Sequence, residues 1–167
     1  MKLIHGDCIK EMQKLEENSI DIIITSPPYN LSIAYNSYRD NLPIDQYLEW
    51  CDSWLAQVAR ILKKDGSFFL NIGNSCTNPW ISNDVANIAR KHFILQNKII
   101  WAKSISVDDK NYGHFKPINS KRYLNHLYED IYHFTLDGNV KIDKLAIGVE
   151  YSDKSNLTRW ESVESDK

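Results

Sequence analysis

The sequence predicts an α/β fold built on a mostly parallel sheet. Short apolar runs alternate with segments that have helical periodicity, which is the order expected of strands joined by crossover helices. The run Ile20–Thr25 is β-branched and apolar on both faces, as in a buried parallel strand. The chain has 167 residues, of which 43% are hydrophobic and 25% charged, as expected of one globular domain. Since ligands of such sheets bind beyond the carboxyl ends of strands, we expect the chemistry after Thr25 and Ile72.

The first part of the chain contains three predicted strands or helices before its first long helix. Residues 2–5 are a strand candidate, and Asp7 is placed to cap a helix that runs to about Glu16. The apolar strand 20–25 follows, and then a polar, tyrosine-rich loop over 31–43 that Pro43 closes. A helix with apolar residues at a period of 3.6 extends to about Lys64, where Gly66 provides a stop.

The second part continues the alternation and then changes character. We expect a strand over 67–72, a helix over 81–92 and a strand over 97–103. Residues 104–126 are predicted to form a long irregular stretch, and a strand over 128–135 follows. Asp137-Gly138 predicts a hairpin turn into an antiparallel strand over 139–142. We therefore expect one domain over 1–149 and a polar, partly disordered tail over 150–167.

Composition excludes several classes of protein. The net charge of −2 excludes a uniformly basic nucleic-acid coat, so any contact with DNA needs a local patch. Residues 103–126 form one candidate, with a local net charge of +3 and interleaved aromatic residues. Three cysteines without a C-x-x-C pair and five histidines without ligand spacing predict no metal site. The N-terminus lacks the pattern of a signal peptide, and no apolar run is long enough to span a bilayer, so we expect a cytoplasmic protein.

The segment Thr25-Ser26-Pro27-Pro28-Tyr29-Asn30 carries the clearest chemical signal. The two prolines fix φ and donate no hydrogen bonds, and Ser26 is extended because a proline follows it. Such a corner can hold a planar amino group between Ser26 Oγ and the Pro27 carbonyl while Tyr29 stacks on the attached ring. The alternative is a plain turn or a short polyproline ligand. Its position directly after a buried strand favours a site.

The chain resembles the circularly permuted amino-group DNA methyltransferases, which transfer a methyl group from S-adenosyl-L-methionine (AdoMet) to N4 of cytosine or N6 of adenine. The resemblance runs from about Lys2 to Phe134 and implies a Rossmann-like sheet. Its specific element is the tetrapeptide Ser-Pro-Pro-Tyr, which Asn30 follows. Weaker elements agree in order and spacing: Gly6-Asp7-Cys8, the Ile20–Thr25 strand, Tyr47-Leu48-Glu49-Trp50, and Leu62-Lys63-Lys64-Asp65-Gly66-Ser67.

The resemblance also implies roles for individual residues. The catalytic corner would comprise Ser26, Pro27, Pro28 and Tyr29, and AdoMet would contact Asp7, Cys8, Thr25 and Ser26. Asp7 has the simpler alternative of a helix cap, and the two roles are compatible. A target base has to leave the duplex to be reached, and Ser at the first motif position favours cytosine over adenine. The stretch 104–126 would contact double-stranded DNA unless it is only a solvated loop; the residues expected to meet phosphates are Lys110, Lys116, Lys121 and Arg122.

The sequence departs from the family in its second half. Members carry an F-x-G-x-G-type loop for the methionine end of AdoMet, and none of the six glycines here forms that pattern. We therefore expect a sheet that is incomplete at its C-terminal half. Three explanations fit: a second chain supplies the loop, the chain is an inactive remnant, or it forms a homodimer that binds DNA without turnover. Glutamine-amide methyltransferases also use a Pro-Pro-Tyr corner, but they usually have Asn first and the glycine-rich loop before it.

Overall fold

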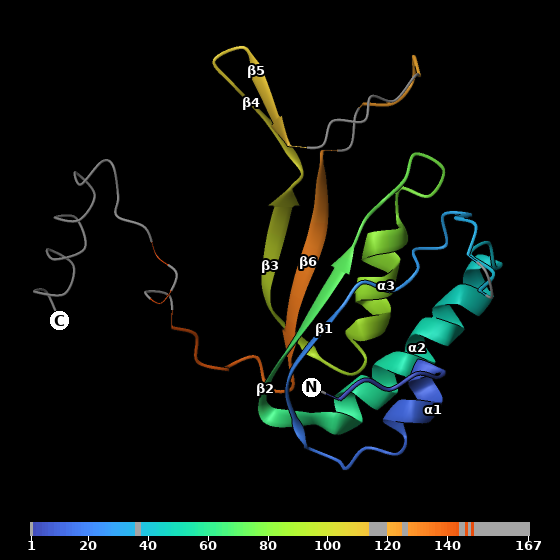
Figure 1. Cartoon of the computed structure of the whole chain (residues 1–167), viewed down its shortest axis with the longest axis vertical. Coiled ribbons are helices and arrows are strands. Elements are labelled where there is room, and N and C mark those ends of the chain that lie inside the picture. Colours follow the sequence, from blue (N-terminus) through green and yellow to red (C-terminus); the bar gives the residue numbers. More distant parts are fainter. Residues whose placement is uncertain are drawn as a thin grey trace, which may run out of the picture.

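The computed structural model describes residues 2–35, 38–113, 120–124 and 127–143, together with 146 and 148. Its centre is a four-stranded sheet in the order β1 (Ile20–Thr25), β2 (Leu62–Ile72), β6 (Tyr128–Thr135) and β3 (Ile94–Ala102), seen in Figure 1. β1 and β2 are parallel, and β6 is antiparallel to both β2 and β3. The three strands β1, β2 and β3 therefore share one direction, which confirms the α/β class. The strands at 20–25 and 128–135 were predicted with their observed bounds.

Helices cover one face of this sheet. Helix α2 (Ile44–Ile61) and helix α3 (Ile81–Ala89) pack on a core that includes side chains from β2 and β6. The core residues from the sheet alternate along each strand: Phe68, Leu70 and Ile72 on β2, and Tyr132 and Phe134 on β6. On β1 only Ile23 faces this core, whereas Ile22 and Ile24 on the opposite face are 60% and 75% exposed. β1 is thus not the doubly buried strand that its composition predicts.

The boundary between α2 and β2 lies earlier than predicted. The helix ends at Ile61, and Leu62 is already extended, with φ −69° and ψ 133°. The last carbonyls of the helix are bound by the preceding loop, since Asn18 N donates to Arg60 O and Ser19 N to Ile61 O. These tertiary contacts end the helix before its Lys-Lys-Asp-Gly signal. α3 likewise ends at Ala89 rather than 92, and β3 begins at Ile94 rather than 97.

The N-terminal segment forms one short helix and no strand. Residues 2–5, predicted as a strand, have no regular structure, because no neighbouring strand pairs with them in the described part of the chain. Helix α1 (Cys8–Met12) is shorter than predicted. Arg60 of α2 fastens this region, since its guanidinium donates to Met12 O at 2.6 Å and to Leu15 O at 3.0 Å.

The antiparallel hairpin lies elsewhere than predicted. Residues 104–113, expected to be irregular, form β4 (Ser104–Val107) and β5 (Lys110–Gly113), which project beyond the main sheet in Figure 1. The connecting Asp108 and Asp109 both have positive φ, the conformation of a tight two-residue hairpin turn.

The expected second hairpin strand at 139–142 is absent. Gly138 does turn the chain with φ 75°, but the segment that follows does not join the sheet ladder. Val140 instead binds the side chain of Gln96, whose amide donates to Val140 O and accepts from Val140 N, at 2.7 and 2.9 Å. Gln96 is available because a register shift between Leu95 and Asn97 leaves it outside the β3–β6 pairing.

Within the described residues, no helix has both the length and the apolar character needed to cross a membrane.

Candidate active site

The Ser-Pro-Pro-Tyr corner leaves the sheet at the carboxyl end of β1 and is held in place by α2. Tyr47 Oη donates to the Pro28 carbonyl at 2.7 Å from the first turn of that helix. Tyr47 is fully buried, so its phenol is a fixed anchor for the corner. The Asn30 side chain binds the backbone of Leu42: Asn30 Oδ1 accepts from Leu42 N at 2.7 Å, and Asn30 Nδ2 donates to Leu42 O at 2.8 Å. The corner is therefore attached to the helix and to the end of the following loop.

The loop after the corner is organised around one buried carboxylate. Asp40 is 3% exposed and accepts hydrogen bonds from three backbone N–H groups, those of Asn30, Leu31 and Ile33, at 2.9 to 3.1 Å. These bonds close the loop on itself, with Asn30 and Ser32 at positive φ. A carboxylate with three donors is a strong local restraint, which explains how a polar loop holds one shape next to the corner.

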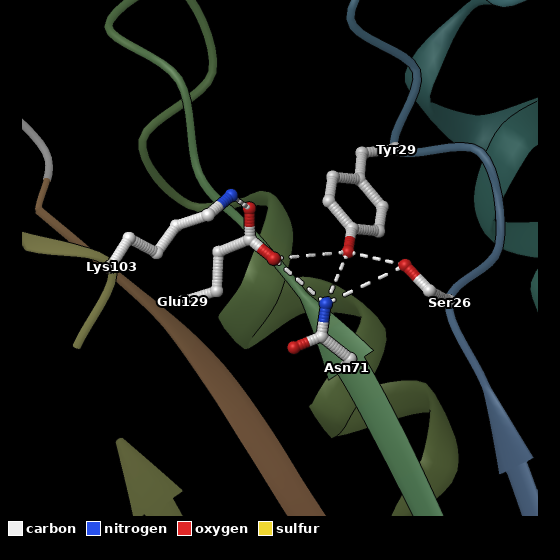
Figure 2. A network of polar contacts seen from close by, with 5 residues as sticks. All are labelled: Ser26, Tyr29, Asn71, Lys103 and Glu129. Carbon is white, nitrogen blue, oxygen red and sulfur yellow. Dashed lines mark hydrogen bonds and ion pairs between the residues drawn. The ribbon is translucent and has the colours of Figure 1, made fainter. Parts of the chain in front are cut away.

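A polar network joins the corner to three other strand ends, as Figure 2 shows. Tyr29 Oη lies 2.6 Å from Ser26 Oγ and 2.6 Å from Asn71 Nδ2, near the end of β2. Asn71 Nδ2 also donates to Glu129 Oε2 on β6 at 2.7 Å, and Tyr29 Oη lies 3.4 Å from the same oxygen. Lys103, directly after β3, forms an ion pair with Glu129 Oε1. The network thus gathers the carboxyl ends of β1, β2 and β3 around the start of β6.

The ion pair sets the charge state of this network. Burial opposes ionisation of Glu129, but hydrogen bonds from Lys103, Asn71 and Tyr29, with the charge of Lys103, outweigh it and lower the pKa of Glu129. Glu129 is therefore a carboxylate at neutral pH. Burial raises the pKa of Tyr29, and the negative charge of Glu129 adds to that increase. Tyr29 is accordingly a neutral phenol, able to donate and to accept.

A pocket of about 290 Å³ opens beside the network. It is lined by the corner, by the loop that Asp40 holds and by the ends of β2, β3 and β6: Ser26, Pro27, Tyr29, Leu31, Ile33, Tyr35, Asn71, Trp101 and Glu129. Aromatic rings and polar acceptors in one pocket suit a flat, apolar ring that carries an amino group. Its position beyond the carboxyl ends of the parallel strands is where the sequence predicts chemistry.

The other predicted residues lie at separate places. Thr25 ends β1 beside the corner. Asp7 caps α1, with Oδ1 accepting from Lys10 N at 3.0 Å, and Cys8 begins that helix at the surface. No hydrogen bond joins Asp7 or Cys8 to residues 25–29 in the part of the chain that is described. Of the predicted DNA contacts, Lys110 is exposed on β5, Lys121 and Arg122 are exposed in the 120–124 segment, and Lys116 lies outside the described residues.

Within the polar network, the sequence did not identify Asn71, Lys103 and Glu129 as site residues. The only available signal was position, since Asn71 and Lys103 lie at the ends of predicted strands. Glu129 cannot be identified from its position in the sequence alone, because it reaches the site only when β6 runs antiparallel between β2 and β3. His133, in contrast, is a packed residue as predicted: it is 1% exposed, and its ring stacks on Phe69 at 4.5 Å. Among the described residues, no group of three or more His, Cys, Asp or Glu side chains is placed to hold a metal ion.

Comparison with known proteins decides the family. The sequence pattern of the DNA methylase family, whose members methylate N6 or N4 amino groups, matches residues 20–167. The chain belongs to this family of DNA methylases. Members of the family are AdoMet-dependent methyltransferases, and the predicted resemblance is thereby confirmed.

Individual members of the family are similar to this chain in sequence. The type II methyltransferase M.MjaVI of Methanocaldococcus jannaschii is 41% identical over 91 residues, which cover 52% of this chain and 47% of the relative. M.ScaI of Streptomyces caespitosus is 27% identical and covers 81% of this chain and 44% of the relative. The DNA adenine methyltransferase YhdJ of Escherichia coli K12 is 29% identical, with 77% and 39% covered. The chain thus spans less than half the length of these curated relatives.

Solved structures share the fold of this chain. The cytosine-N4-specific PvuII DNA methyltransferase has a TM-score of 0.64 at 20% identity, over 95% of this chain and 61% of that one. TTHA0409 of Thermus thermophilus, solved in complex with AdoMet, has a TM-score of 0.58 at 21% identity, over 84% and 57%. These likenesses confirm the Rossmann-like methyltransferase sheet.

Proposed function

We propose that this chain carries the catalytic part of a site-specific DNA methyltransferase that transfers the AdoMet methyl group to N4 of a flipped cytosine. The observation that carries the proposal is the Ser-Pro-Pro-Tyr corner at the mouth of the pocket, where a hydroxyl, a proline carbonyl and an aromatic ring meet. The cytosine-N4-specific PvuII enzyme is one structural relative. N6-methylation of adenine is the second candidate, because the relative YhdJ is a DNA adenine methyltransferase.

In this proposal the corner acts on the amino group of the base. The lone pair of an exocyclic amine is delocalised into the ring, which makes the nitrogen a weak nucleophile. Two acceptors, Ser26 Oγ and the Pro27 carbonyl, bind its two N–H groups and favour a pyramidal nitrogen with a localised lone pair. Tyr29 stacks on the ring, and Pro28 keeps the corner rigid through its bond to Tyr47.

The methyl transfer needs no covalent enzyme intermediate. Bound AdoMet supplies an electrophilic methyl group on a positively charged sulfur. The amine nitrogen forms the new N–C bond as the S–C bond breaks, the bonding electrons stay on sulfur, and one amine proton leaves to water. The chain's own part is to bind, orient and desolvate the amine.

AdoMet contacts are proposed at Asp7, Cys8, Thr25 and Ser26. In support, Asp7 carries a carboxylate at the surface and Cys8 begins α1, where backbone N–H groups have no partner within the helix. An acceptor and a donor side by side suit the edge of an adenine ring. An F-x-G-x-G-type loop for the methionine end would come from a second, different chain, whereas a homodimer would bind DNA without turnover. The exposed Ile22 and Ile24 on edge strand β1 support such a partner surface.

Double-stranded DNA is the proposed macromolecular partner. The domain over 1–149 would place its 104–126 insertion against DNA, with phosphate contacts from Lys110, Lys116, Lys121 and Arg122. Three of these are exposed in the described structure, on the β5 strand and in the 120–124 segment. Location in the cytoplasm, and disorder of the tail over 150–167, which lies outside the described residues, remain predictions.

The proposal is tested by incubating the chain with labelled AdoMet and DNA and then analysing the nucleosides. We expect N4-methylcytosine, and N6-methyladenine would instead establish the second candidate. Ser26→Ala should lower the rate at least tenfold with little effect on DNA affinity, whereas Ser53→Ala, which removes an exposed hydroxyl on α2, should leave it unchanged. DNA binding without any methylated base would identify a binding subunit and contradict turnover by this chain alone.

A further inference from the structure

The ion pair between Lys103 and Glu129 has no part in the proposed reaction as described so far. It nevertheless lies beside the corner, since Figure 2 shows Lys103 ending at one oxygen of Glu129 while the other oxygen faces Tyr29. Glu129 is one hydrogen-bonded residue away from Ser26, through Tyr29. A charged pair is costly to bring into a pocket, so its effect on the neighbouring hydroxyl groups matters.

The direction of some of these hydrogen bonds is fixed by chemistry. A carboxylate only accepts, so the amide of Asn71 must turn its nitrogen toward Glu129. This orientation leaves the buried Asn71 Oδ1 without a hydrogen-bond partner in the described structure, a cost that the bond to the charged carboxylate has to exceed. The second N–H of Asn71 then donates to Tyr29 Oη at 2.6 Å. The single hydroxyl hydrogen of Tyr29 is left with two acceptors, Ser26 Oγ at 2.6 Å and Glu129 Oε2 at 3.4 Å.

These two choices have opposite consequences for Ser26. If Tyr29 donates to Ser26, one Ser26 lone pair is occupied and the serine hydrogen points elsewhere, including toward an incoming amine. If Tyr29 donates to Glu129, Ser26 donates to Tyr29, and its lone pairs are left for the amine apart from a long contact of 3.5 Å with Asn71 Nδ2. Only the second arrangement suits an acceptor of amine hydrogens. An N–H donor that approaches Ser26 favours this second arrangement. The arrangement also requires an acceptor for the Tyr29 hydrogen, and the carboxylate of Glu129 is that acceptor.

Two features keep Glu129 ready as that acceptor. Lys103 keeps the carboxyl group ionised and holds one of its oxygens, which leaves Oε2 for Asn71 and Tyr29. Gly73 makes the space, because a Cβ on this residue would lie 3.0 Å from Glu129 Cγ and 3.2 Å from its Cδ and Oε1.

We propose that Glu129 is a positioning residue that orients the hydrogen-bond chain Ser26→Tyr29→Glu129, so that Ser26 Oγ offers lone pairs to the target amine. This inference rests on the proposed function, because it assigns Ser26 as the acceptor. Glu129 also lines the pocket, and in this proposal it acts on Ser26 through Tyr29.

The test is a double-mutant cycle between Glu129→Gln and Tyr29→Phe. In Glu129→Gln the amide oxygen faces the Lys103 cation, so the amide nitrogen faces Tyr29 and reverses the chain. We expect kcat to fall roughly tenfold to a hundredfold and KM for DNA to change less than about twofold. In the Tyr29→Phe background the chain is already broken, so the same change should cost less than about twofold. Equal losses in both backgrounds would overturn the role of Tyr29 as intermediary.

Surface and structural effects need separate controls. Glu17→Gln removes the same charge from an exposed position and should not alter kcat. Lys103→Met keeps Glu129 in place but removes the partner that holds its pKa low. Because the carboxylate form is the active one, the acid limb of the kcat profile should move to higher pH in this variant. An unmoved limb would contradict the need for an ionised Glu129.

A measurement without turnover separates this inference from the proposed function. In protein labelled with ¹³C at the tyrosine Cζ atoms, the Tyr29 signal should show a step as Glu129 titrates, and Glu129→Gln should abolish that step. In Lys103→Met the step should move to higher pH. If no DNA is methylated, the proposed function fails, but the titration still shows whether the Tyr29 signal follows the ionisation of Glu129. A Tyr29 signal without that step overturns the inference even when the wild-type protein is active.

Discussion

Single residues outside the pocket determine the shape of the corner. Asp40 illustrates this, because its carboxylate holds three backbone N–H groups of the loop that lines the pocket. Tyr47 does the same from the helix by binding the Pro28 carbonyl. Neither side chain lines the pocket. The conformation of the corner therefore depends on buried hydrogen bonds from residues that do not line the pocket.

Asp40→Asn tests that dependence. The substitution removes the charge and turns one acceptor oxygen into a donor, so at least one of the three backbone N–H groups loses its partner. We expect the free energy of unfolding to fall by about 2 kcal/mol, as measured by urea denaturation. The exposed Asp65→Asn should change it by less than about 0.5 kcal/mol. If the two variants are equally stable, the carboxylate does not hold the loop.

At the level of elements, the β4–β5 hairpin carries Lys110, one of the basic residues of the 104–126 region. Directly paired residues share a face, so Ile105, Val107, Lys110 and Tyr112 lie on one side of this hairpin. All four are exposed. A projecting ribbon with a cation and an aromatic ring on one face is suited to lie along a DNA backbone or groove.

Replacing Lys110, Lys121 and Arg122 by Ala should weaken DNA binding and flatten its dependence on salt. For every phosphate that is no longer neutralised, the slope of log K against log[salt] should decrease by about 0.9, measured by fluorescence anisotropy over a salt series. The matched variant replaces Lys10, Lys14 and Lys64, which are also exposed, and should keep the wild-type slope. A slope unchanged by the first set would remove this region from the interface.

The elements differ in how far the sequence predicts them. The strand at 20–25 and the corner after it follow from local chemistry, namely β-branched residues and two prolines. The end of α2 does not, because Asn18 and Ser19 bind its last carbonyls from elsewhere in the chain. The hairpin turn was missed because Asp108-Asp109 lacks the glycine that usually marks positive φ. Glu129 was missed because its place in the site depends on how β6 pairs, which no local pattern encodes.

For the whole molecule, the important asymmetry is between the two faces of the sheet. α2 and α3 cover the face that carries Ile23 and Phe68. The opposite face carries Ile22, Ile24 and Trp101, which are about half to three-quarters exposed. The polar network lies on this second face, since Asn71 and Glu129 alternate with core residues of β2 and β6. The site is thus built at the border of the surface that the described helices leave open.

Two neighbouring residues of β1 report on this asymmetry. Ile23→Thr places a hydroxyl group against the core and should lower the free energy of unfolding by about 1–2 kcal/mol. Ile24→Thr keeps a β-branched side chain at an exposed position and should change it by less than about 0.5 kcal/mol. Thermal or urea unfolding of the isolated chain compares them. Equal losses would mean that the open face is packed in solution.

The two hydrogen bonds between the Gln96 side chain and the Val140 backbone affect how this sheet can be extended. At the start of β3, the bulged Gln96 occupies both backbone groups of Val140 and keeps that segment beside the strand without letting it join the ladder. A foreign strand that approached this border would meet a stretch of chain already fastened there. Edge strand β1 has no comparable segment hydrogen-bonded beside it among the described residues. A strand added at the start of β3 would therefore have to displace Val140, whereas one added along β1 would displace no comparable contact among the described residues.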